Sequence, residues 1–287
     1  MTTNQRYRIA VVAVVTSAIL NSGVGVLIRQ VQAADEWQII AVRGLGVTFG
    51  LALIFALQER GRIGEALVKI SPWLLMGGFF QTAASLCYIH AIQNTTIANT
   101  LFIQSAAPFA TAILAWLCLK ETVHRGTWAA MFIATAGIAV MVSDGISQGN
   151  GFGNIMALGS MLFFSAFVVV LRFGRTANML PVVLFSWVVS FGIGAAMAGG
   201  NLVIPLSDFI FILLWGAILS PIVYALFTFG SRYVLGAEVS LLVQVEFILG
   251  PLLVWLIVNE EPTPMTLIGG ALVLAAVITR GIQMTRA

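Results

Sequence analysis

The chain has 287 residues, of which 60% are hydrophobic and 9% are charged, and its formal net charge is +3. A soluble domain of this length needs far more polar surface, so this composition excludes one and makes the lipid bilayer the solvent for most of the chain. The positive balance would suit a nucleic-acid partner, but the sequence has no basic run or charged face, so we expect none.

Apolar segments close to the length that an α-helix needs to cross a bilayer recur along the whole chain. We expect an all-α polytopic membrane protein with ten transmembrane helices. They lie at about residues 9–28, 39–57, 72–91, 97–119, 127–143, 152–171, 181–200, 208–230, 237–258 and 265–282. The first segment is about twice as long as the apolar core of a signal peptide, so we expect it to remain as a helix. The short connectors leave no room for a soluble domain.

The second half of the chain repeats the first. A gapless offset of 139 residues aligns residues 74–136 with 213–275. Identical pairs include Trp116/Trp255, Glu121/Glu260 and Thr127/Thr266. The turn that begins at Lys120 keeps its cations, whereas the matching turn that begins at Asn259 has none. Two copies of opposite orientation in a membrane differ in this way. We therefore predict two five-helix repeats, residues 1–143 and 152–287.

The cations predict the orientation. With the N-terminus inside the cell, twelve Lys and Arg residues fall on inner segments and only Arg29 falls in an outer loop. The inner cations are Arg6, Arg8, Arg60, Arg62, Lys69, Lys120, Arg125, Arg172, Arg175, Arg232, Arg280 and Arg286. Short cytoplasmic loops carry such an excess of positive charge. We therefore expect both termini in the cytoplasm. Because five helices per copy is an odd number, the second copy then enters the membrane from the opposite side.

Polar side chains inside the spans are candidates for a binding site, because they are costly to expose to lipid. The third span carries Gln81, Ser85 and Tyr88 on one helix face, and the 139-residue offset maps them onto Ser220, Tyr224 and Phe227. Two such stripes would face each other across a central cavity. Alternatively, they form hydrogen bonds that hold the bundle together.

Three further polar residues lie within spans. Glu246 is a carboxylate near the middle of one span. It would accept a substrate ammonium or carry a proton. Alternatively, it is a protonated or hydrogen-bonded group that holds its helix to a neighbouring one. Arg43 is a possible anchor for a substrate carboxylate, although snorkelling to the outer headgroups is the favoured interpretation. Asn21 interrupts the first span beside small residues and could line a cavity or allow close packing.

Catalytic signatures such as HExxH, GxSxG and Walker A are missing, so we expect no enzyme, no cofactor and no metal. Cys87 and Cys118 both fall in apolar segments and are expected to pack as small hydrophobes.

Two segments resemble the EamA repeat of the drug/metabolite transporter superfamily. Residues 98–142 do so through Ala107-Pro108, Leu119-Lys120-Glu121 and Ala136-Gly137-Ile138. Residues 237–280 do so through Ser240-Leu241-Leu242, Glu246, Val258-Asn259-Glu260, Pro262 and Gly269-Gly270-Ala271. The repeat's Glu-Pro step is split here between Glu246 and Pro108. The resemblance implies ten helices in inverted repeats and alternating access around a central cavity, with Glu121 and Glu260 as helix-end caps or gates. The chain looks most similar to YddG-type exporters of aromatic and other amino acids.

We therefore expect an inner-membrane exporter of amino acids or related metabolites that binds a small solute near the midplane. Aromatic walls would come from Tyr88, Phe164, Tyr224 and Phe227, and hydrogen bonds from Asn21, Gln81, Ser85, Ser220 and Gln244. Transport would be facilitated or proton-coupled. A drug or nucleotide-sugar carrier of the same fold and a non-transporting scaffold or lipid enzyme remain alternatives. A monomer is compatible with all of these, and the sequence does not set the oligomeric state.

Overall fold

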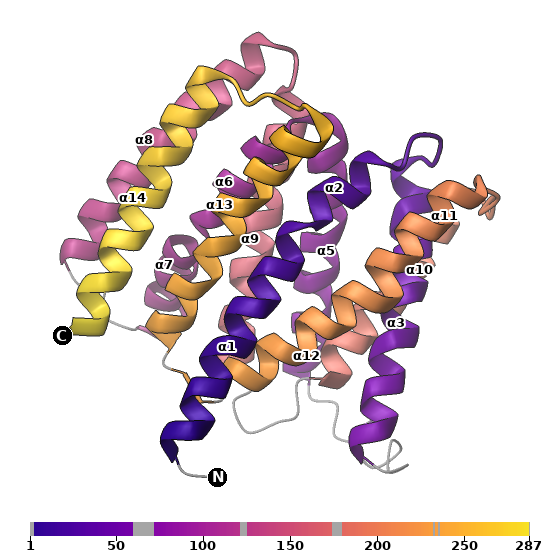
Figure 1. Cartoon of the computed structure of the whole chain (residues 1–287), viewed down its shortest axis with the longest axis horizontal. Helices are drawn as coiled ribbons and strands as arrows, with labels where there is room; N and C mark the ends of the chain where they lie inside the picture. The colour runs from indigo at the N-terminus through magenta and orange to yellow at the C-terminus, as the bar shows by residue number, and fades with distance from the viewer. Residues whose placement is uncertain are drawn as a thin grey trace.

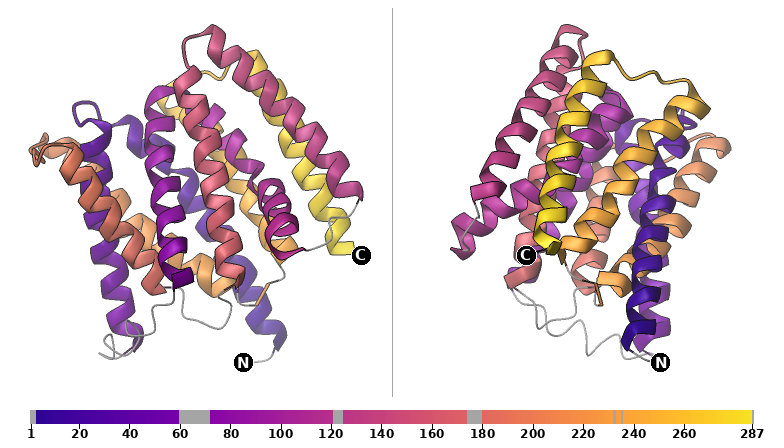
Figure 2. Two further views of the ribbon diagram at one scale, coloured as in Figure 1. Left: turned by 180° about the vertical axis from the view of Figure 1, so that it is seen from behind. Right: turned by 60° about the vertical axis from the view of Figure 1, so that its left-hand side comes forward.

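In the computed structural model, the protein is a bundle of helices that stand side by side, and both termini lie toward the same side of it (Figure 1). The structure describes residues 3–59, 72–120, 125–173, 180–231, 233–234 and 236–286. The two rotated views confirm that the N- and C-terminal ends lie toward one side of the bundle (Figure 2). Of the cations predicted on the inner side, Arg60, Arg62, Lys69, Arg175 and Arg232 lie outside the described residues.

The helices follow the predicted spans closely. In chain order they are α1 (Thr3–Ser22), α2 (Val24–Arg29), α3 (Glu36–Glu59), α5 (Pro72–Asn94), α6 (Ile97–Ser105), α7 (Ala107–Leu119), α8 (Arg125–Ser147), α9 (Gly151–Phe173), α10 (Leu180–Met197), α11 (Leu206–Leu213), the π-helix η1 (Leu214–Leu219), α12 (Ser220–Ser231), α13 (Gly236–Val258) and α14 (Pro264–Arg286).

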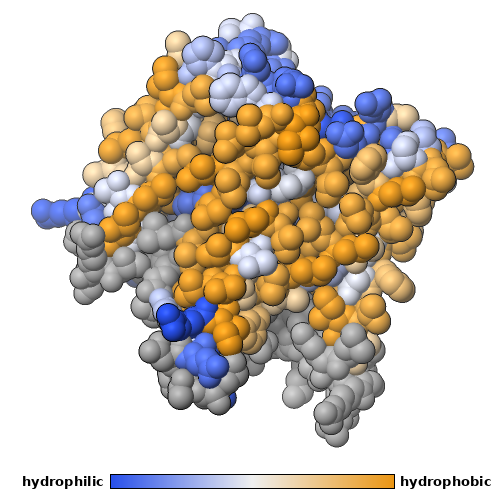
Figure 3. Space-filling model, in the orientation of Figure 1, coloured by the Kyte–Doolittle hydropathy of each residue, from blue (hydrophilic) through white to orange (hydrophobic). Residues whose placement is uncertain are grey.

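Eight helices of the described chain are long and apolar enough to cross a membrane, and Val182–Met197 and Leu242–Val258 are shorter apolar helices. Apolar side chains cover most of the visible face, and hydrophilic ones gather toward its upper and lower ends (Figure 3). Such an apolar surface is the kind that hydrocarbon solvates. The chain is therefore a multi-pass membrane protein.

Three of the expected spans are divided. Gly23 separates α1 from α2, as the small and polar residues there predicted. Ala106 separates α6 from α7, which places Pro108 in the first turn of α7, where its missing N–H is tolerated. The third break is the π-helix η1 between α11 and α12. Hydropathy does not reveal it, because a π turn changes the winding of a helix and leaves its composition unchanged.

Glycines set the closest helix packing. The main neighbours are α5 with α9, α3 with α10, α8 with α14, and α1 with both α12 and α13. A Cβ on Gly46 would meet the backbone of Ala217, and one on Gly50 would meet Pro221, so these two glycines, four residues apart, allow close helix packing. Gly137 in α8 and Gly269 in α14 each lie against the other's carbonyl oxygen.

Candidate functional site

The centre of the bundle holds a buried arginine. Arg43 of α3 is 8% exposed. Its guanidinium carbon lies 4.4 Å from the ring centroid of Trp187 in α10 and 3.9 Å from that of Trp215 in η1. Nη1 of Arg43 donates a hydrogen bond of 3.3 Å to Oγ of Ser85 in α5. With indoles beside the guanidinium, its hydrogen-bond donors point outward from its edge.

This placement overturns the favoured interpretation of Arg43. A snorkelling arginine extends along the helix to the headgroups and keeps its charge in water. Arg43 instead points into the bundle, and its Nε is a buried donor with no hydrogen-bond partner. The indoles of Trp187 and Trp215 attract the guanidinium group and offset part of the cost of burying its charge. An unpaired donor on a buried cation is suited to an incoming acceptor.

The predicted residues of the two polar stripes meet around this arginine. Tyr88 of α5 and Tyr224 of α12 each interact electrostatically with both Arg43 and Glu246. Glu246 of α13 accepts a hydrogen bond of 2.6 Å from Nδ2 of Asn21, close to the break between α1 and α2. Within the described residues, Arg43 and Glu246 form no ion pair with each other. Arg43 and the Glu246 carboxyl group thus both act on the same two tyrosines without forming an ion pair with each other.

Trp215 lies in the π-helix η1, which packs closely on α3. A Cβ on Gly216 would lie 2.8 Å from the carbonyl oxygen of Arg43, so η1 and α3 pack backbone to backbone at this level. The adjacent Trp215 is buried against Arg43. Sequence reasoning missed Trp187 and Trp215, because a tryptophan in an apolar span has the composition of ordinary core. The 139-residue offset gave a partial signal, since it aligns Gly216 with Gly77.

The remaining predicted site residues differ in how deeply they are buried. Gln81 is buried one turn from Ser85, and its Oε1 has no hydrogen-bond partner. Ser220 and Gln244 are buried as well. Phe164 and Phe227 are more open, at 41% and 38% exposure. Phe164 contacts Phe167 of its own helix, with ring centroids 6.3 Å apart.

A cavity of about 180 Å³ lies away from this cluster, between α7, α8 and α9. Its lining is almost entirely apolar and includes Phe109, Ile113, Met131 and Met161, with Thr135 as a polar member. None of the predicted site residues lines it. This apolar cavity is therefore separate from the polar cluster around Arg43.

Apolar helices that enclose buried charges define a membrane protein with a polar interior, which is the construction that transporters use. The chain matches the EamA-like transporter family over residues 8–143 and 151–279, and it belongs to that family.

Similar proteins support this membership. An uncharacterized transporter of Archaeoglobus fulgidus is 26% identical over 271 residues, which are 93% of this chain and 94% of that protein. Human solute carrier family 35 member G1 is 26% identical over 170 residues, which are 54% of this chain and 46% of the carrier. A crystal structure with 17% identity has a TM-score of 0.68 and covers 94% of this chain and 97% of that one. At this identity it shows the likeness of the folds alone.

Proposed function

We propose that this protein exports amino acids or closely related zwitterionic metabolites across the inner membrane. The observation that carries the proposal is that a buried arginine, Arg43, and a carboxyl group, Glu246, both act on Tyr88 and Tyr224 without forming an ion pair with each other. An α-amino acid has a carboxylate for Arg43 and an ammonium for Glu246. The two tyrosines would contact its side chain, which suits aromatic and other apolar amino acids.

Alternating access would expose this site to each side of the membrane in turn. We propose that ten helices in two inverted repeats, 1–143 and 152–287, move against each other, with both termini in the cytoplasm. The helix neighbours support this division. α1 of the first repeat packs on α12 of the second, and their counterparts, α9 of the second repeat and α5 of the first, pack on each other in the same way. Packing of α3 with α10 and of α8 with α14 joins equivalent helices.

The energy source has two candidates. Glu246 is the carboxylate at the centre of the site, and Asn21 is the hydrogen-bond partner that the structure gives it. If Glu246 exchanges its proton for the substrate ammonium, export is coupled to proton entry. If it keeps one protonation state, the protein is a facilitator that moves solute down its own gradient.

The test is uptake of labelled solute into liposomes that contain the purified protein. The panel pairs each aromatic amino acid with its amide, which lacks the carboxylate charge, and with its decarboxylated amine. We expect competition by the amino acid and at least tenfold weaker competition by either analogue, because an unpaired buried charge remains in each case. Competition by lipophilic cations alone would indicate a drug carrier, and competition by nucleotide sugars alone a nucleotide-sugar carrier. Either result would contradict the proposal.

Repeating the uptake with and without an imposed pH gradient separates the two energy sources. Uptake that needs the gradient contradicts a facilitator, and uptake that ignores it contradicts proton coupling. Protein-free liposomes are the control for leakage.

A further inference from the structure

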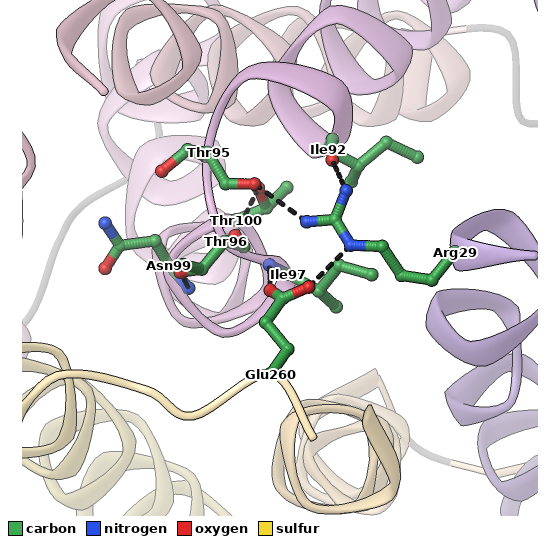
Figure 4. Close-up of polar contacts among 8 residues, drawn as sticks. All are labelled: Arg29, Ile92, Thr95, Thr96, Ile97, Asn99, Thr100 and Glu260. Carbon is green, nitrogen blue, oxygen red and sulfur yellow. Dashed lines mark hydrogen bonds and ion pairs between the residues drawn. The ribbon is translucent and has the colours of Figure 1, made fainter. Parts of the chain in front are cut away.

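A second charged group lies on the side of the bundle opposite the termini. This Arg29 cluster consists of Arg29, Glu260, the carbonyl groups of Ile92 and Thr95, and the N–H of Ile97 (Figure 4). Arg29 ends α2, and Glu260 lies in the connection between α13 and α14. The cluster therefore joins two segments that lie 231 residues apart.

Arg29 uses three nitrogen atoms in this cluster. Nε donates to Oε2 of Glu260 at 2.5 Å, Nη1 donates to the carbonyl oxygen of Ile92 at 2.7 Å, and Nη2 donates to that of Thr95 at 3.0 Å. The two carbonyl groups belong to the last turn of α5 and the residue that follows it. A carbonyl oxygen at a helix C-terminus favours a cation, so the position suits arginine.

Glu260 uses both carboxylate oxygens. Oε2 accepts from Arg29, and Oε1 accepts from the backbone N–H of Ile97 at 2.7 Å. Ile97 is the first residue of α6, whose unpaired N–H groups favour an anion. Glu260 thus holds the ends of α2 and α6 together. Both side chains are largely buried, at 21% exposure for Arg29 and 19% for Glu260.

Apolar packing lies directly beneath the cluster. Ile28, Ile92, Ile97 and Val254 belong to one buried core and are almost fully buried. A Cβ on Gly25 would come within 2.7 Å of Val254 and 3.0 Å of Ile97, so α2 sits tightly against α13 and α6. These apolar contacts lie next to the backbone groups of Ile92 and Ile97 that the cluster uses.

We propose that Arg29 and Glu260 form the bonded pair that keeps the outer side closed, and that their separation sets how often the site opens outward. The proposal takes two points from the proposed function: that this side of the protein faces outward, and that a solute leaves through it. Its physical basis is independent of the solute, because opening has to break the hydrogen bonds that join α2 and α6 to Glu260. Loss of one charged hydrogen bond is therefore expected to raise the open population by about tenfold or more.

The test measures opening directly with a single cysteine at the buried position Val254. In a background where Cys87→Ser and Cys118→Ser remove both natural cysteines, Val254→Cys is treated with a membrane-impermeant maleimide in lipid vesicles. We expect slow labelling in this parent and about tenfold faster labelling after Glu260→Gln or Arg29→Gln. The matched control is Glu261→Gln, which removes the same charge from the exposed neighbouring residue and should leave the rate unchanged.

Two further variants test the geometry. The double variant Arg29→Gln with Glu260→Gln should label more slowly than the product of the two single effects predicts, because both substitutions break the shared contact between Nε of Arg29 and Oε2 of Glu260. The charge exchange Arg29→Glu with Glu260→Arg should fail to restore slow labelling. It would place a carboxylate against the carbonyl groups of Ile92 and Thr95 and a guanidinium against the N–H of Ile97. Slow labelling of this exchanged variant would contradict the hydrogen-bond geometry described for the Arg29 cluster.

Thermal unfolding in detergent shows whether each variant is folded. If a glutamine variant fails to fold, Arg29→Lys keeps the charge but loses the planar fork, and we expect it to label severalfold faster than the parent. Unchanged labelling in all folded variants, or an equal increase with Glu261→Gln, would overturn the proposal. Faster labelling without flux of any solute would refute the proposed function and leave the role of the pair intact. Solute flux without faster labelling would refute the role of the pair and leave the proposed function intact.

Discussion

Lys120 and Asn259, which lie 139 residues apart, adopt the same left-handed backbone conformation. Their φ angles are 54° and 58°, and among the described residues they are the two non-glycine residues with positive φ. Each follows the helix that ends its copy's fourth predicted span, α7 or α13. The sequence offset had already aligned these two positions. The shared conformation is what two related copies would retain, because it ends a helix in the same way.

The left-handed conformation predicts unequal effects of substitution at the two positions. Asparagine tolerates this conformation and lysine does so at a higher cost. Lys120→Asn should therefore raise the free energy of unfolding by roughly 0.5–1 kcal/mol, whereas Asn259→Val should lower it by about 1 kcal/mol. Thermal unfolding of the detergent-solubilised protein measures both. A loss of stability in Lys120→Asn would contradict the prediction.

The crossing of α8 and α14 predicts a sharp requirement for glycine. A Cβ on Gly137 would lie 2.6 Å from the carbonyl oxygen of Gly269, which is backbone and cannot rotate away. We expect Gly137→Ala to lower stability by about 1–3 kcal/mol, as overpacking does. Gly192→Ala is the control, because a Cβ there meets nothing within 4 Å. The melting temperatures of the two variants should differ clearly, and equal values would show that the helices readjust freely.

The environment of Arg43 predicts that lysine cannot replace it. Lysine carries the charge but lacks the planar group that lies against Trp187 and Trp215 and donates from its edge. In liposomes, Arg43→Lys should weaken the apparent affinity for an amino acid at least tenfold. It should also reduce the preference for the amino acid over its amide. An unchanged preference would mean that Arg43 does not contact the carboxylate.

The Asn21–Glu246 contact predicts how coupling responds to substitution. Glu246→Gln removes the proton-carrying group and leaves a side chain of the same shape that can still bond Asn21. If transport is proton-coupled, this variant should lose all response to a pH gradient, and the solute exchange that remains should have a lower apparent affinity, because the substrate ammonium loses its carboxylate partner. Asn21→Ala keeps the carboxylate and should retain the response. Persistence of the response in Glu246→Gln would place the coupling group elsewhere.

The sequence anticipated part of the candidate site. Gln81, Ser85 and Tyr88 were selected from helical spacing, and the structure brings Ser85 and Tyr88 to Arg43. The offset that paired Gln81 with Ser220 crosses η1 in the second copy. Ser220, Tyr224 and Phe227 all lie in α12, directly after this π turn, so the stripe itself keeps regular helical spacing. Tyr224 still reaches the centre, whereas Phe227 is 38% exposed.

The sequence by itself determined that this protein lives in a membrane, where its helices run and which residues of its two halves correspond. These properties are local or statistical, since the bilayer selects apolar length and loops carry the excess of cations. Tertiary structure decided that Arg43 points inward between two indoles, that Asn21 meets Glu246 and that Arg29 meets Glu260. Such partners lie up to 231 residues apart, so hydropathy and spacing do not report them. A buried charge takes its role from the groups that its helix packing brings to it.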